Sequence, residues 1–227
     1  MNKIKYDAEE RTRERYQSQH YAKQYKKEYV SDLSFKGIRS RIIANREIKV
    51  IKNILDGYVN DGMTVMDLPC GTGKLGPILS NYPIKIVAGD ISKEMLSLAK
   101  NEYKVNKVEY KVIDATNITY GDGSIDVIIC LRLFQRLDKE TRKKILHEFS
   151  RVGDGVLIVS YSHTSLWQKI RTFIRNLIMK NINIFFSASM KIIEDELTKA
   201  GFKVLYTKSV LPIISSEIVV YAQCPSR

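Results

Sequence analysis

The sequence predicts an α/β fold, in which helices cover both faces of a mostly parallel β-sheet. From Thr64 onward, apolar strand-like segments alternate with helical segments, as expected for parallel strands joined by crossover helices. A glycine-rich turn directly follows the first of these strands. The last two strands have no helix between them, so we expect an antiparallel hairpin at one edge of the sheet.

The predicted elements follow one another in regular order. After a strand that begins at Thr64, the expected strands are 84–88, 108–113, 125–130, 155–161, 203–206 and 218–222. The expected helices are 38–55, 92–103, 138–151 and 189–201. Ser92 and Asp138 are suitable N-caps, because their side-chain oxygens can accept hydrogen bonds from the first turn. The stripe expected to be buried on the first helix consists of Ile42, Ile43, Val50, Ile51, Ile54 and Leu55.

Length and composition indicate an ordinary folded enzyme. The chain has 227 residues, of which 44% are hydrophobic, enough for one α/β domain with a modest appendage. We expect an N-terminal helical cap at 1–56 and a main domain at 57–227, with an insertion at 162–186. The charged N-terminus lacks the apolar core of a signal peptide. Three scattered cysteines show no metal-ligand spacing, so we expect a cytoplasmic protein without a metal site.

The net charge of +12 has two interpretations. It indicates either an anionic partner, such as RNA, a phospholipid surface or an acidic substrate, or merely a lysine-rich composition. Acidic residues are mixed with the basic ones over most of the chain, so both interpretations stay open.

The turn after the first strand is the most informative motif. Residues 65–76 read V-M-D-L-P-C-G-T-G-K-L-G, with Asp67 at the strand end. A phosphate-binding P-loop would need glycine at position 68 and Ser or Thr at position 75, and both positions are leucine. The dinucleotide fingerprint G-x-G-x-x-G does fit, with Asp90 about twenty residues further on, so an NAD-dependent oxidoreductase is one alternative.

The residues around the glycines favour another ligand. The run D-L-P-C-G-T-G at 67–73 resembles the D-x-G-x-G-x-G loop of class I S-adenosylmethionine-dependent methyltransferases. The run D-I-S-K-E-M-L at 90–96 and the Asp114-Ala115 pair are similar to the family's next two strand ends. The resemblance extends from about residue 55 to the C-terminus. It implies a Rossmann-like three-layer sandwich, whose mostly parallel seven-stranded sheet contains one antiparallel strand.

The resemblance also implies a cofactor site for S-adenosylmethionine, with S-adenosylhomocysteine as product. Gly71 and Gly73 would let the loop approach the methionine part, and Asp67 would act near the amino group. Asp90 would accept from the ribose hydroxyls. The residues that the resemblance places at the cofactor are Asp67, Pro69, Cys70, Gly71, Thr72, Gly73, Asp90, Ile91, Met95, Asp114, Ala115 and Cys130. Pro69 departs from the pattern, because it replaces a glycine and cannot donate a backbone hydrogen bond.

The catalytic residues are not identified by the motif. Many similar small-molecule enzymes have histidines at the positions of Gln135 and Arg136, which leaves no obvious general base here. The candidates are His20, Tyr21, Tyr25, Arg132, Gln135, Arg136 and His163. The two arginines would bind an anionic acceptor or form salt bridges. The absence of N-P-P-Y argues against amino-methylation of DNA bases.

Two segments are candidates for acceptor selection. The run Y-A-K-Q-Y at 21–25 is similar to family segments that fold over the cofactor, although plain packing on the sheet is the alternative. The insertion 162–186 interleaves aromatic and basic residues. We favour a lid helix that admits a small-molecule or lipid-like acceptor, ahead of an anionic membrane surface at the inner membrane and of RNA binding. A monomer or a homodimer is expected.

Overall fold

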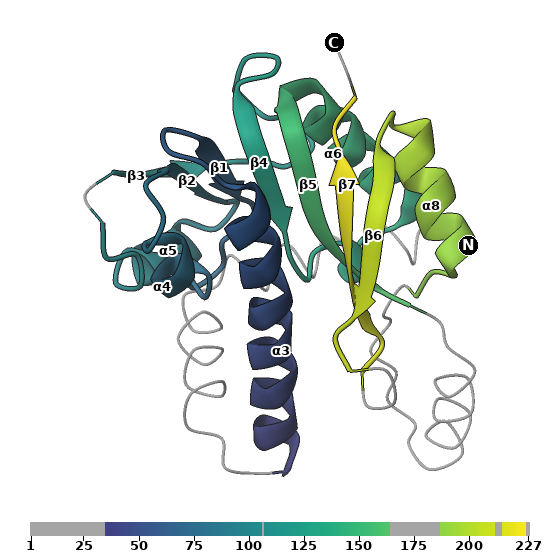
Figure 1. The fold of residues 1–227 in the computed structure, drawn as a ribbon, viewed down its shortest axis with the longest axis horizontal. Coiled ribbons are helices and arrows are strands. Elements are labelled where there is room, and N and C mark those ends of the chain that lie inside the picture. Colours follow the sequence, from purple (N-terminus) through teal and green to yellow (C-terminus); the bar gives the residue numbers. More distant parts are fainter. Residues whose placement is uncertain (1–34, 106, 164–186, 212–214, 226–227) are drawn as a thin grey trace.

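The computed structural model describes residues 35–105, 107–163, 187–211 and 215–225 (Figure 1). The N-terminal candidates His20, Tyr21 and Tyr25 therefore lie outside the described residues, as does the predicted insertion beyond His163.

The seven strands form one sheet in the order β3-β2-β1-β4-β5-β7-β6. The strands are β1 Thr64–Asp67, β2 Lys85–Asp90, β3 Val108–Val112, β4 Ile125–Cys130, β5 Gly153–Ser162, β6 Lys203–Ser209 and β7 Glu217–Gln223. β1 to β5 pair in parallel, whereas β7 lies antiparallel to both β5 and β6. The predicted class, a mostly parallel sheet with one antiparallel strand, is confirmed.

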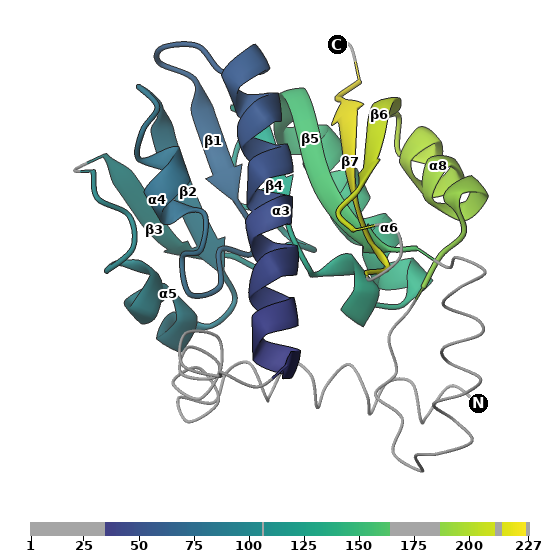
Figure 2. The ribbon, with the colours of Figure 1, turned by 60° about the horizontal axis from the view of Figure 1, so that its bottom comes forward.

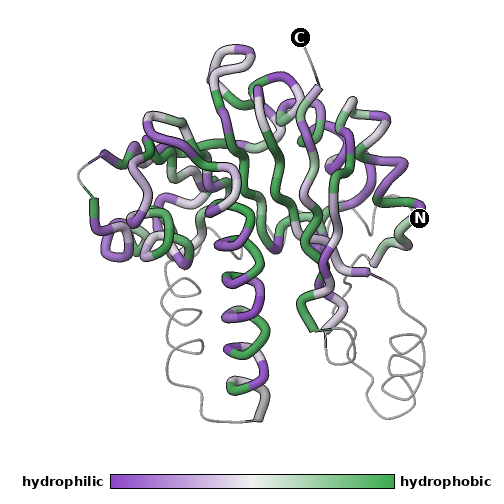
Figure 3. Tube along the Cα trace, viewed as in Figure 1, coloured by the Kyte–Doolittle hydropathy of each residue, from purple (hydrophilic) through white to green (hydrophobic). Residues whose placement is uncertain are grey.

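The described helices pack in two layers, one on each face of the sheet. They are α3 Phe35–Tyr58, α4 Gly76–Leu79, α5 Lys93–Ala99, the 3-10 turn η1 Phe134–Arg136, α6 Lys139–Val152 and α8 Met190–Lys199. α3, α4 and α5 pack on one face, and α6 and α8 on the other. α3 crosses the front of the sheet while α6 lies behind it (Figures 1 and 2). Successive residues of each central strand alternate between the two cores, so these strands are the most continuously hydrophobic part of the chain (Figure 3).

The predicted N-caps are confirmed. The Ser92 hydroxyl accepts from the backbone N–H of Met95 at 3.2 Å, and the Asp138 carboxylate accepts from that of Thr141 at 2.8 Å. α5, however, ends at Ala99 rather than near residue 103. The chain from 99 to 103 instead forms a turn that packs closely against the glycine loop.

The predicted stripe of α3 is correct except at Ile42, since Ile43, Val50 and Ile54 are partly buried and pack against the core on that face. Ile51 and Leu55 are buried in the core, but Ile42 is 48% exposed and was wrongly assigned. The N-terminal half of α3 projects past the carboxyl ends of the strands, where no sheet covers it (Figure 1). Glu47 is buried instead. α3 runs through residue 56, the predicted end of the cap, and that boundary stays a prediction.

Candidate functional site

The glycine loop lies at the carboxyl end of β1, beside the end of β2. The Cys70 N–H donates to the carbonyl of Gly89 at 2.7 Å, which holds the loop over the neighbouring strand. The Leu68–Pro69 peptide bond is cis. Gly71 and Gly73 have φ values of 54° and 83°, a left-handed conformation that favours glycine.

The glycines of this loop have different roles. A Cβ atom on Gly71 would meet no atom of the described residues within 4 Å, so with respect to these residues its backbone is open to a ligand. A Cβ on Gly73 would lie 2.9 Å from the Cα of Ala99, and one on Gly76 would lie 2.8 Å from the carbonyl carbon of Glu102. Gly73 and Gly76 therefore allow the loop to pack against the turn after α5. Of the two glycines predicted to approach the cofactor, Gly71 is the one with open space.

Asp90 fixes the loop from the end of β2. One carboxylate oxygen accepts from the Gly71 N–H and the other from the Ser92 N–H, both at 2.9 Å. Burial raises the pKa of Asp90 to about 6, against the lowering effect of the hydrogen bonds from Ser92 and Gly71. Each carboxylate oxygen has two lone pairs. Asp90 can therefore hold the loop and still accept hydrogen bonds from a pair of ligand hydroxyls.

Asp67 is buried beneath the loop. Its Oδ2 atom accepts from the hydroxyl of Tyr103 at 2.6 Å. Burial raises the pKa of Asp67 to about 7; the Tyr103 hydrogen bond lowers it and the nearby Asp90 raises it. Tyr103 was not a predicted site residue, since it was expected only as the end of a helix. Tyr103 belongs to the turn that packs against the glycine loop, and this packing is visible only in the fold.

The other residues that were predicted to lie at the cofactor differ in how far they are exposed. Thr72, Met95 and Cys130 are buried, while Ile91, Asp114 and Ala115 are partly exposed. The side chain of Cys130 is in the core with 0% exposure, so only its backbone can face a ligand. Asp114 accepts from the backbone N–H and the hydroxyl of Thr116 at 2.9 and 2.7 Å.

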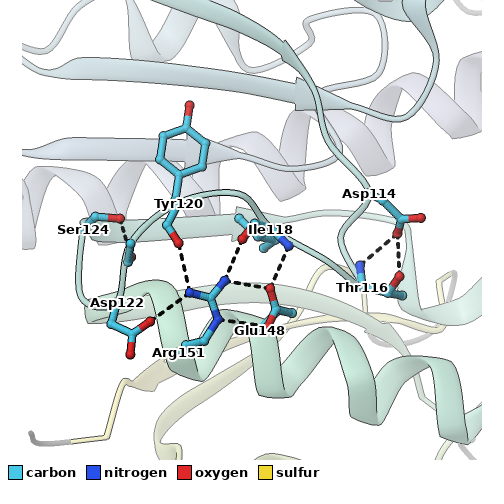
Figure 4. A network of polar contacts seen from close by, with 9 residues as sticks. Asp114, Thr116, Ile118, Tyr120, Asp122, Ser124, Glu148 and Arg151 are labelled. Carbon is cyan, nitrogen blue, oxygen red and sulfur yellow. Dashed lines mark hydrogen bonds and ion pairs between the residues drawn. The ribbon is translucent and has the colours of Figure 1, made fainter.

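The loop that follows Asp114 is held by Arg151 of α6 (Figure 4). The guanidinium donates to the carbonyls of Tyr120 and Ile118 at 2.9 and 2.6 Å. Glu148 pairs with Arg151 at 2.8 Å and accepts from the Ile118 N–H at 2.7 Å. This loop therefore has a fixed path from β3 to β4.

A charged cluster lies at the same edge of the sheet, beyond β4. Arg132 has a φ of 59°, and its N–H donates to the Ser160 hydroxyl at 2.7 Å. Its Nε and Nη2 atoms lie 2.9 and 2.8 Å from Oε2 of Glu47, and Nε lies 3.3 Å from Oε1 of Glu217. Of the two predicted roles for Arg132, the structure therefore shows the salt bridge. Arg136 donates from Nε to the carbonyl of Arg132 at 3.1 Å.

Lys74 connects this cluster with the glycine loop. Burial and the neighbouring Arg132 lower its pKa to about 6. Burial and the neighbouring Glu47 raise the pKa of Glu217 to about 8. Glu47, Lys74 and Glu217 were missed from the sequence. A signal existed for Glu47, because it continues the spacing of Ala44, Ile51 and Leu55 on the buried side of α3.

The remaining candidates lie near the same edge. Gln135 is in η1, and its buried Oε1 atom has no hydrogen-bond partner among the described residues. His163 follows β5, with Nδ1 3.3 Å from the carbonyl of Ala188. In the described part of the chain, no group of three His, Cys, Asp or Glu residues could hold a metal ion. No described helix has the length and apolarity needed to cross a membrane.

Comparison with known proteins decides what this site is. Residues 65–153, which include the glycine loop, Asp90 and Asp114, match the family described as a methyltransferase domain. This part of the chain is a class I S-adenosylmethionine-dependent methyltransferase domain. The family resemblance, the enzyme class and the cofactor expected from the motifs are confirmed.

Other proteins resemble the chain over more of its length. An uncharacterized protein of Methanocaldococcus jannaschii is 28% identical, over 85% of this chain and 82% of its own. Phosphoethanolamine N-methyltransferase 2 of Caenorhabditis elegans is 24% identical over 74% of this chain, which spans only 38% of that enzyme. The structure of magnesium protoporphyrin IX methyltransferase from Synechocystis PCC 6803 with bound SAH has a TM-score of 0.81. It covers 94% of this chain and 98% of its own at 17% identity, a likeness of fold.

Three observations fit the binding of S-adenosylmethionine at this site. Among the described residues, no atom lies within 4 Å of a Cβ built on Gly71, which leaves room for part of a ligand beside its backbone. Asp90 accepts from the backbone N–H groups of Gly71 and Ser92, one on each carboxylate oxygen, and keeps lone pairs that a pair of ligand hydroxyls could use. The chain order of the sheet also reverses between β1 and β4, the place where ligands of open α/β sheets bind.

Proposed function

We propose that the protein transfers a methyl group from S-adenosylmethionine to a small-molecule or lipid-like acceptor, bound beside the charged cluster beyond β4. The observation that carries this proposal is the joint geometry of Gly71 and Asp90 at the carboxyl ends of β1 and β2. The comparisons give no support to the oxidoreductase or RNA-binding alternatives.

In this proposal each residue of the site has a distinct role in binding the cofactor. Asp90 binds the ribose hydroxyls through charge-assisted hydrogen bonds. Ile91 and Met95 flank the adenine, and Asp114 accepts from its exocyclic amine. Asp67 acts at the amino group. The sulfonium supplies an electrophilic methyl group, and most of the rate then comes from holding the acceptor in line with it.

We also propose a cytoplasmic protein, either monomeric or dimeric, with contact to an anionic membrane surface as a further property. The three cysteines are free and buried, which supports a reducing compartment. Sedimentation in the presence of anionic and neutral vesicles would test the membrane contact, and salt-sensitive binding to the anionic vesicles alone is the expected result.

The test of the proposed function compares Asp90→Ala with Asp195→Ala. Asp195 is a matched control, since it is an exposed aspartate that pairs with Lys199 on α8. We expect S-adenosylhomocysteine to bind the wild type and the control equally, and to bind Asp90→Ala at least about 100-fold more weakly, because two hydrogen bonds to a charged group are lost. Calorimetry measures these affinities, and circular dichroism checks the fold. Near-normal affinity in Asp90→Ala would sink the proposal.

A further inference from the structure

Asp67, the last residue of β1, is held on only one of its two carboxylate oxygens. Oδ2 accepts a hydrogen bond from the hydroxyl of Tyr103 at 2.6 Å, whereas no donor among the described residues reaches Oδ1. The residue is 2% exposed, so bulk water has little access to it. Because buried carboxylates are nearly always paired or fully hydrogen-bonded, the open oxygen indicates that a ligand donor completes this site.

The titratable groups around Asp67 include no cation in the described part of the chain. Asp90 at the end of β2 carries a charge that raises the pKa of Asp67. Burial, and then the charge of Asp67, raise the pKa values of the thiols of Cys70 in the glycine loop and Cys130 in β4. The hydroxyl of Tyr103 is the group that favours the ionised form of Asp67. A positively charged ligand group would therefore improve this environment more than a neutral one.

The position of Tyr103 is fixed by the packing of its backbone and its ring. A Cβ atom on Gly76 would lie 2.9 Å from the backbone nitrogen of Tyr103, so the turn after α5 is in close contact with the glycine loop. The ring is 6% exposed and meets the ring of Tyr110 in β3 edge to face, with centroids 5.8 Å apart. The hydroxyl thus reaches Asp67 from a rigid support.

The strand order places Asp67 at the amino-acid end of the proposed cofactor. Asp114 follows β3 and Asp90 ends β2, and in the proposed function these residues bind the adenine and the ribose. β1 is the next strand in the sheet, and the chain order reverses between β1 and β4. A cofactor that lies across β3 and β2 in this direction therefore extends its amino-acid part toward Asp67.

We propose that Tyr103 is a positioning residue for the cofactor: its hydroxyl holds Oδ2 of Asp67, so that Oδ1 accepts from the ammonium group of S-adenosylmethionine. This inference rests on the proposed function and adds a residue to the same site. In this role Tyr103 acts through the carboxylate, and the contact with the ammonium group belongs to Asp67.

The pH dependence of binding follows from this arrangement. Burial raises the pKa of Asp67 to about 7, the Tyr103 hydrogen bond opposes that rise, and the charge of Asp90 adds to it. An ammonium group binds an ionised carboxylate more tightly than a protonated one. The affinity for a ligand with an ammonium group should therefore increase as the pH rises through about 7. Without the Tyr103 hydroxyl the pKa is higher still, which moves this increase to higher pH.

The experiment compares two ligands that differ in a single group. One is S-adenosylhomocysteine, and the other is deamino-S-adenosylhomocysteine, in which a hydrogen atom replaces the amino group. Calorimetry on the full chain measures both dissociation constants between about pH 6 and pH 9. Burial also raises the pKa of Asp90 to about 6. Because both ligands carry the ribose, the titration of Asp90 affects both, and the ratio of the two affinities isolates the ammonium group.

The test variant is Tyr103→Phe, which removes the hydroxyl and keeps the buried ring. The matched control is Tyr110→Phe, because this neighbouring ring is partly buried and its hydroxyl makes no contact with Asp67. Circular dichroism checks the fold of both variants. Binding of the deaminated ligand gives a second check, since it requires an intact loop and an intact Asp90.

We expect Tyr103→Phe to bind S-adenosylhomocysteine about 10-fold more weakly than the wild type at pH 7, because one hydrogen bond to a charged group is lost. The same variant should bind the deaminated ligand within about two-fold of the wild type. The increase in affinity for S-adenosylhomocysteine should move to higher pH in Tyr103→Phe. Tyr110→Phe should match the wild type with both ligands.

Three results would overturn the inference. Equal weakening of both ligands in Tyr103→Phe would mean that the hydroxyl supports only the fold of the loop. Unchanged affinity with an unshifted pH profile would mean that Asp67 keeps its orientation without Tyr103. A wild type that binds the deaminated ligand as tightly as S-adenosylhomocysteine would show that the ammonium group is not recognised here, and would leave the proposed methyl transfer intact. Only a wild type that binds neither ligand would count against the proposed function itself.

Discussion

The buried carboxyl of Asp67 makes the stability of the protein depend on pH. It is 2% exposed and has one hydrogen-bond donor from a side chain, the hydroxyl of Tyr103. Burial dominates, so the pKa of its carboxyl rises from 3.8 to about 7. The folded protein therefore binds a proton at this site more tightly than the unfolded chain does. Between about pH 4 and pH 7, that difference lowers the free energy of unfolding as the pH rises.

We predict that Asp67→Asn removes this pH dependence. The free energy of unfolding of the variant, relative to the wild type, should increase from about pH 4 to pH 8 by a few kcal/mol, on the order of 4, because the amide carries no charge to bury. Urea unfolding of the ligand-free protein at several pH values measures it. Asp61→Asn, in the exposed turn before β1, is the control and should show a constant difference. A constant difference for Asp67→Asn as well would mean that the buried carboxyl is not protonated.

At the scale of elements, the glycine loop and the turn after α5 fit together as one unit. Gly73 and Gly76 leave no room for a Cβ atom, because the backbone of residues 99–103 occupies that position. The same turn brings Tyr103 to Asp67. α5 thus ends early because the following residues pack against the loop. Helix propensity describes only local preferences and does not predict this tertiary packing.

We predict that alanine has opposite effects at two glycines. Gly73→Ala should destabilise the fold by about 2–4 kcal/mol, because it combines a clash with backbone atoms and a positive φ. Gly57→Ala, in α3 with nothing within 4 Å of the new Cβ, should stabilise the fold by about 0.5–1 kcal/mol. Thermal and urea unfolding measure both changes. A Gly73→Ala variant as stable as the wild type would contradict the close packing of loop and turn.

The elements themselves were largely predictable, since their signals are local. Ser92 and Asp138 cap their helices through residues three positions away, within one turn of chain. The contacts of the site, in contrast, join residues that are far apart in the sequence. Tyr103 reaches Asp67 across 36 residues, and Arg132 reaches Glu47 across 85. No periodicity or motif encodes such a pairing; it follows from the order in which strands assemble.

At the scale of the whole molecule, the cofactor residues and the charged cluster lie at the same edge of the sheet, where the parallel strands end. The residues expected at the cofactor lie at the ends of β1, β2, β3 and β4, and most of them belong to motifs that resemble a known family and could be found from the sequence. The charged cluster draws on α3, the end of β4 and β7, which are far apart in the sequence. Its members are ordinary charged residues in the sequence, and only the sheet order brings them together.

The antiparallel direction of β7 has a consequence for the synthesis of the protein. Because β7 runs against β5, its first residue, Glu217, lies at the edge where the parallel strands end, and β7 also separates β5 from β6. A growing chain that has not released the final segment from the ribosome can build β1 to β5 but not this corner of the site. The strands that carry the glycine loop and Asp90 are therefore synthesised before Glu217, the member of the charged cluster that belongs to β7.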